Sequence, residues 1–168
     1  AEVNAKTFLP NRRTVKICQN KDELNCILKE NNVNVPDSFH IESEEDLKNK
    51  VDKILSNNKK AWIRAIRGAG SRAALPISKY RHAHSWIKWW VDMRGLKFSD
   101  FMISEFLPGK EYAWQSVWNN GDLIVSQARE RVEYLFANLT PSGQSSSPSV
   151  ARSVHNDSVN ELASKAVK

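Results

Sequence analysis

Residues 62–77, WIRAIRGAGSRAALPI, contain the residue types that bind phosphate. Two of the chain's six glycines, Gly68 and Gly70, lie here beside Ser71 and between two apolar runs. Three arginines accompany them: Arg64, Arg67 and Arg72. Glycines let backbone N–H groups approach an anion closely, and arginine guanidinium groups offset its charge. The stretch therefore indicates a loop that closes over phosphate, with a hairpin whose turn is basic as the alternative.

The remaining polar residues do not form a catalytic or metal-binding motif. The four histidines lie in unrelated contexts, and Cys18 and Cys26 are not spaced as metal ligands. The sequence therefore indicates neither a hydrolytic Ser-His-Asp arrangement nor a zinc site. Two isolated thiols, and the lack of a signal-like or membrane-spanning apolar run, predict a cytoplasmic protein with no membrane partner. The net charge of +6 favours anionic partners.

The elements that must position these residues follow from the hydrophobic pattern. Helices are predicted after the capping residues Asn20 and Ser43, over 84–94 before Gly95, and near the end of the chain after Asp157 or Ser158. Alternation of apolar and polar residues predicts the strands, at 38–41, 61–66, 73–77, 101–109, 111–118 and within 123–139, with 140–149 as a polar loop. Helices mixed with strands, followed by antiparallel strands, predict an α+β fold. The 168 residues suit one domain or a compact piece of a larger protein.

The tryptophans could serve either of two roles, nucleic-acid binding or core packing. Basic residues surround several of the six tryptophans, which is compatible with stacking on nucleic-acid bases. Trp62, Trp86, Trp89 and Trp90, however, recur at strand and helix spacing. We therefore expect these four side chains to pack a hydrophobic core.

Several segments, taken in their order along the chain, resemble the ATP-grasp superfamily and, within it, the carbamoyl-phosphate-synthase-like branch. They are Lys21 at a helix start, WIRAIRGAGSR, ISEFLPGKEYAWQSVW and SQARERVEY. The resemblance covers roughly residues 19–155. It implies an ATP-grasp-like fold with a small lid subdomain and an antiparallel sheet. It also implies that ATP is the cofactor.

The resemblance assigns the first group of residues to the phosphates of ATP. Arg64 matches the basic residue that ends the strand before the loop and reaches the phosphates, and Lys21 matches a second basic residue of that site. The loop 67–72 matches the mobile lid, in which Gly68, Gly70 and Ser71 face the phosphates. A solvated arginine at a strand edge is the alternative for Arg64.

The second group matches the residues that bind the nucleoside. Glu105 and Leu107 would present a backbone carbonyl and N–H to adenine, and Glu111 would accept hydrogen bonds from the ribose hydroxyls. Arg129 and Arg131 alternate on one strand, near phosphate or the acyl substrate, and the residue spacing leaves open which of them faces the site. A strand-turn-strand unit with Glu111 as a surface charge is the alternative.

The resemblance also implies that part of the enzyme lies outside this chain. Residues 1–18 would connect to a preceding domain, 36–104 would form the lid subdomain, and 105–168 would begin the large lobe within a partial domain 19–168. The carboxylates that hold Mg²⁺ in this family are expected beyond residue 168. The complete protein would be a ligase that activates a carboxylate or bicarbonate as an acyl phosphate, which an amine or similar nucleophile attacks.

Two other functions remain open from the sequence alone. The chain could be a non-catalytic ATP-grasp-like binding module, or a basic nucleic-acid-binding domain. The arginines cluster at the loop and on one strand, with acidic residues between them, whereas a nucleic-acid interface is a broader basic stripe. This distribution favours a nucleotide over nucleic acid.

Overall fold

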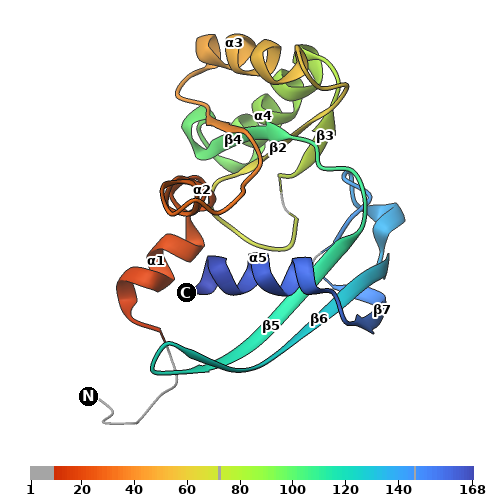
Figure 1. Ribbon diagram of the computed structural model, residues 1–168. Helices are drawn as coiled ribbons and strands as arrows, with labels where there is room; N and C mark the ends of the chain where they lie inside the picture. Colours follow the sequence, from red (N-terminus) through yellow and green to blue (C-terminus); the bar gives the residue numbers. More distant parts are fainter. Residues whose placement is uncertain (1–9, 72, 146) are drawn as a thin grey trace, which may run out of the picture.

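The computed structural model describes residues 10–71, 73–145 and 147–168. In these ranges the chain forms five α-helices and seven β-strands in two antiparallel sheets (Figure 1), which confirms the α+β prediction. None of the helices described is long and apolar enough to cross a membrane. The helices are α1 Arg12–Gln19, α2 Lys21–Glu30, α3 Glu44–Leu55, α4 Tyr80–Arg94 and α5 Asp157–Val167; the strands are β1 Ser38–His40, β2 Ala61–Ala65, β3 Leu75–Ile77, β4 Phe101–Glu105, β5 Glu111–Asn119, β6 Asp122–Tyr134 and β7 Pro148–Val154.

The first sheet has the strand order β1-β4-β2-β3, and it contains the main hydrophobic core. On β2, Ile63 lies opposite Ile103 of β4 and Leu75 of β3. Helices α3 and α4 pack against this sheet (Figure 1). Side chains from both helices, from the strands and from the residue after β1 meet there and are almost completely buried: Ile41, Leu47, Val51, Ile63, Ile77, Ile87, Phe101 and Ile103. This core fixes the backbone of β2 and β4.

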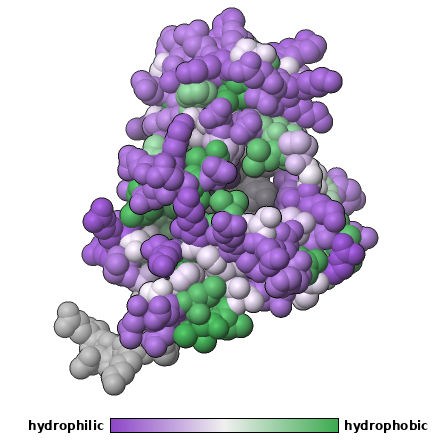
Figure 2. All heavy atoms as spheres, in the orientation of Figure 1, coloured by the Kyte–Doolittle hydropathy of each residue, from purple (hydrophilic) through white to green (hydrophobic). Residues whose placement is uncertain are grey.

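The second sheet has the order β5-β6-β7. The turn between β5 and β6 places Asn120 and Gly121 at φ +51° and +89°, the left-handed values that a tight hairpin requires. Helix α5 lies across one face of this sheet (Figure 1), where the Trp114 indole N–H donates to Asn160 Oδ1 over 2.9 Å. Figure 2 shows an apolar patch over the outer part of the hairpin, where Val117, Ile124 and Val125 are exposed.

Helix α3 begins at the predicted capping residue. The Ser43 hydroxyl oxygen accepts a hydrogen bond from the Asp46 backbone N–H over 3.3 Å. We expect Ser43→Ala to lower the free energy of unfolding by about 1 kcal/mol, because that N–H loses its partner. Urea denaturation checks this, with Ser85→Ala on an exposed position of α4 as the control. An equal loss in both variants would show that the cap does not stabilise the fold.

Three elements differ from the sequence prediction. The segment interpreted as a connector contains α1, which Asn11 caps by accepting from the Thr14 N–H over 2.9 Å. Helix α4 begins at Tyr80, four residues before the predicted start at His84. Strand β7 occupies a stretch predicted in part as loop. Helix α1 and β7 have almost no buried side chains, so neither contributes to the core from which the other elements were predicted.

The tryptophans of α4 follow the prediction in part. Trp86 and Trp90 pack against the core, as expected. Trp89 does not: its side chain remains 44% exposed and meets the Trp90 ring edge to face, at 5.2 Å between centroids. Trp62 of β2 lies outside the core, beside the pockets described next.

Candidate functional site

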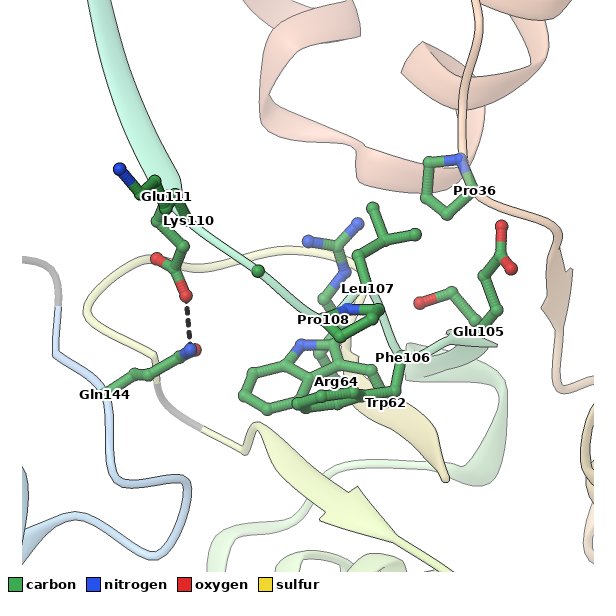
Figure 3. A pocket seen from close by; sticks show the side chains of 12 residues that line it. Pro36, Trp62, Arg64, Glu105, Phe106, Leu107, Pro108, Lys110, Glu111 and Gln144 are labelled. Atoms are coloured by element: carbon green, nitrogen blue, oxygen red, sulfur yellow. Dashed lines mark hydrogen bonds between the residues drawn. The ribbon is translucent and has the colours of Figure 1, made fainter. Parts of the chain in front are cut away.

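Two neighbouring pockets lie beside β2, on the side away from the core. The first, of about 280 Å³, is bordered by the segment that leads from β4 to β5 (Figure 3). The second, of about 290 Å³, is bordered by the glycine loop after β2. Trp62, Arg64 and Gln144 line both pockets, so the two form one continuous candidate site.

Strand β2 directs two side chains toward this site because its residues alternate between its two faces. Ala61, Ile63 and Ala65 are buried in the core, whereas Trp62 and Arg64 point the other way. Trp62 lies against Phe106, with ring centroids 6.1 Å apart and the rings tilted by 50°. The expectation that Trp62 packs a core is therefore wrong, because its side chain forms an aromatic wall of the pockets.

Arg64 carries a partly buried charge with free hydrogen-bonding capacity. Its Nε is buried and has no hydrogen-bond partner among the described residues. Burial lowers the pKa of Arg64 from its usual value, although a guanidinium stays protonated at neutral pH. A buried donor without a partner is costly, and an anion in the pockets would supply the missing acceptor.

The predicted loop residues line the second pocket together. Gly68, Gly70 and Ser71 have φ values of +108°, +74° and +56°, all in the left-handed range. A Cβ atom at either glycine would meet no atom within 4 Å, so crowding does not explain these glycines. Their backbone conformation does, because glycine adopts left-handed φ values without strain.

Lys21 lies in the same pocket and contacts the stem of the loop. Its Nζ donates to the Ile66 carbonyl over 3.1 Å and to the Gly68 carbonyl over 2.9 Å. Burial lowers the pKa of the Lys21 ammonium, and the neighbouring Arg64 charge lowers it further. The structure thus brings Lys21, Arg64 and the glycines together, as the sequence predicted.

Glu105 and Leu107 line the first pocket. The Glu105 N–H donates to the Asp37 carbonyl over 2.9 Å, and the Asp37 N–H donates to Glu105 Oε1 over 3.1 Å. Asp37 therefore engages both the N–H and the side chain of Glu105. The carbonyl of Glu105 remains as the backbone group available to a ligand, next to Pro36, which has no N–H to donate.

Glu111 also lines the first pocket, and its two carboxylate oxygens have different partners. One accepts from the Tyr134 hydroxyl and the other from the Gln144 side-chain amide (Figure 3 shows the second contact). Burial raises the pKa of the Tyr134 hydroxyl, and Glu111 raises it further. Sequence reasoning did not single out Tyr134 or Gln144. Gln144 lies within the polar loop 140–149, where only the amide itself distinguishes it from its neighbours.

The two predicted arginines of β6 lie on one face of the strand, but their surroundings differ. Arg131 is opposite Glu111 across the β5–β6 pair, and its Nε is buried without a partner in the described part of the chain. Arg129 lies one step further away and donates to Gln115 Oε1 over 2.7 Å. Neither lines the two pockets. Arg131 is the nearer of the two to the candidate site, a distinction that residue counting left open.

The described residues contain no group of three or more His, Cys, Asp or Glu side chains arranged to hold a metal ion. Near the pockets, Glu105 is engaged by Asp37 and Glu111 by Tyr134 and Gln144. The two carboxylates that line the first pocket are thus already held by neighbouring groups of the protein.

Three solved structures are similar to this chain in fold. The L-amino acid ligase from Bacillus licheniformis matches with a TM-score of 0.64 and 15% identity, over 95% of this chain and 36% of its own. D-alanyl-alanine synthetase A from Vibrio cholerae matches with a TM-score of 0.64 and 12% identity, over 90% and 45%. The biotin carboxylase domain of the Hydrogenobacter thermophilus 2-oxoglutarate carboxylase, in complex with MgADP, ADP and bicarbonate, matches with a TM-score of 0.67 and 13% identity, over 92% and 34%.

These comparisons establish the fold. All three proteins are ATP-grasp ligases, and this chain spans less than half the length of each. The chain therefore has the fold of part of an ATP-grasp domain, as the sequence resemblance implied. No protein-family model and no curated protein sequence matches the chain.

Proposed function

We propose that this chain is the ATP-binding portion of an ATP-grasp ligase of the carbamoyl-phosphate-synthase-like branch. The observation that carries the proposal is the pair of joined pockets, which share Trp62 and Arg64. The first pocket adds Phe106 and the segment between β4 and β5, and the second adds Lys21 and the glycine loop. A nucleotide has the same division, with a flat base at one end and phosphates at the other. In this proposal residues 36–104 form the lid subdomain and 105–168 begin the large lobe.

The base occupies the first pocket in this proposal. Trp62 and Phe106 supply an aromatic wall, and the Glu105 carbonyl and the Leu107 N–H meet the edge of adenine. Glu111 accepts hydrogen bonds from the ribose hydroxyls. Each of its oxygens has one partner, the Tyr134 hydroxyl or the Gln144 amide, and a carboxylate oxygen can accept a second hydrogen bond.

The phosphates occupy the second pocket, where Arg64 offsets their charge and the loop 67–71 supplies backbone N–H groups. In the complete ligase, an oxygen of a carboxylate or of bicarbonate attacks the γ-phosphorus, and ADP leaves. An amine or similar nucleophile then attacks the acyl carbon and releases phosphate. The residues of this chain bind and orient the nucleotide, which is the main requirement for phosphoryl transfer. Mg²⁺, when bound, would offset charge on the phosphates, and the described residues contain no group of three or more His, Cys, Asp or Glu side chains arranged to hold it.

Titration of the ¹⁵N-labelled chain with ATP tests this proposal, because amide shifts also locate weak binding. We expect the shifted amides to surround the two pockets, with Arg64, Gly68, Gly70 and Glu111 among them. A single-stranded oligonucleotide should not displace ATP. Shifts on α4 caused by the oligonucleotide, with no response to ATP, would instead support the nucleic-acid alternative.

The ribose assignment gives a second test. We expect Glu111→Ala to weaken ATP binding about tenfold, because hydrogen bonds between the ribose and a charged group are lost. Binding of 2′-deoxy-ATP should change less, so the preference for ATP over 2′-deoxy-ATP should shrink. Affinities of Glu111→Ala and of the unmodified chain for both nucleotides, measured by the same titration, test this assignment.

Glu133→Ala is the matched control, since Glu133 lies on exposed β6 outside both pockets. It removes one carboxylate and should leave both affinities as they are. If Glu111→Ala reduced both affinities by the same factor, Glu111 would not be the partner of the 2′-hydroxyl.

A further inference from the structure

Lys21 contacts the glycine loop in the free protein, which a residue that serves only to bind phosphate would not need to do. Its Nζ bonds two carbonyls of the loop stem, those of Ile66 and Gly68, at 3.1 and 2.9 Å. The Lys21 backbone N–H also donates to the Ile66 carbonyl, over 3.2 Å. The first residue of α2 thus holds the loop by its main chain and its side chain together.

Lys21 and Arg64, the two cations of the second pocket, differ in their hydrogen bonds. An ammonium group has three N–H donors, and the carbonyls of Ile66 and Gly68 occupy two of those on Lys21. Arg64 has no hydrogen bond to compare with these among the described residues, and its Nε is buried without a partner. Arg64 therefore has the free donors that an incoming anion requires.

The backbone of the loop supports a role for Lys21 in holding the loop and for Arg64 in binding an anion. Gly68 has a φ of +108°, and its carbonyl reaches the Lys21 ammonium in that conformation. Ile66 is held from a second side, since its N–H donates to the Asp100 carbonyl over 2.8 Å. The start of the loop is thereby fixed between α2 and the segment before β4 without a ligand.

We propose that Lys21 is a positioning residue that holds the glycine loop in shape before a nucleotide binds, while Arg64 is the cation that meets the phosphates. The identity of the ligand as a nucleotide rests on the proposed function. The contact between Lys21 and the loop does not depend on that function and can be measured in the free protein.

Limited trypsin digestion without nucleotide provides the measurement. Trypsin cleaves after Arg67, an exposed residue between the two carbonyl groups that Lys21 contacts. We expect Lys21→Met to speed this cleavage about tenfold, because loss of the hydrogen bonds to the charged group raises the population of the open loop. Lys21→Arg keeps a cation with several donors and should restore most of the protection. Mass spectrometry identifies each cleavage site.

Two comparisons separate this effect from general destabilisation. Cleavage after Lys59, in the exposed loop before β2, should keep its rate in every variant. Lys29→Met removes the same charge from the exposed end of α2 and should leave cleavage after Arg67 unchanged. Faster cleavage at both sites, or unchanged cleavage after Arg67 in Lys21→Met, would overturn the role of Lys21. Either result would leave the nucleotide proposal standing, because no nucleotide is present.

Discussion

Replacing Arg64 with methionine is expected to weaken ATP binding by about ten- to a hundredfold. A hydrogen bond to a charged group contributes about 1.5–3 kcal/mol, and each 1.4 kcal/mol corresponds to a factor of ten. Methionine keeps the apolar stem and removes the donors. Arg64 lines both pockets and its buried Nε has no described partner, whereas Lys21, the other cation of the second pocket, is hydrogen-bonded to loop carbonyls. Titration of both proteins with ATP measures the difference.

Arg67→Met is the matched control for this prediction. Arg67 lies three residues after Arg64, in the loop that follows β2, and is exposed and outside both of these pockets. Its loss removes the same charge and should change the affinity only slightly, because exposed charges are screened by solvent and salt. Equal losses in the two variants would mean that ATP responds only to the overall positive charge of the chain.

Phe101→Ala is expected to have the largest effect on stability. Phe101 is fully buried at the start of β4, opposite Ala65 of β2, within the core of the first sheet. Truncation of a buried phenylalanine costs about 3–5 kcal/mol, through lost contacts and the cavity that remains. We expect the free energy of unfolding to fall by that amount in urea denaturation.

The same substitution at Phe136 provides the comparison. Phe136 is 63% exposed beyond the end of β6, so Phe136→Ala should change stability by less than about 0.5 kcal/mol. Similar losses at both positions would show that the burial described for Phe101 is not what stabilises the fold.

Elements with a buried face were predictable from the sequence. Helix α3 has three buried apolar residues at helical spacing after its cap Ser43, and β2 alternates strictly between buried and partly exposed residues. Both patterns arise because the side chains that face the core must be apolar. Helix α1 and β7 have no such constraint, because the core contains none of their side chains.

The candidate site was predictable to the extent that its residues share a motif. Arg64, Gly68 and Gly70 are close in sequence, and they do line one pocket. Tyr134 and Gln144 reach Glu111 from 23 and 33 residues away, through the pairing of β5 with β6 and the path of the following loop. Such contacts are set by tertiary structure, so no local pattern indicated them.

The alternation of β2 has a consequence for how this site can diversify. Ala61, Ile63 and Ala65 of β2 supply the packing, and Trp62 and Arg64 line the pockets, so the two sets of positions are separate. A change of ligand preference can arise at Trp62 without repacking the interior. Mutation at that position, in nature or in a randomised library, can thus change which ligands bind while the fold stays the same.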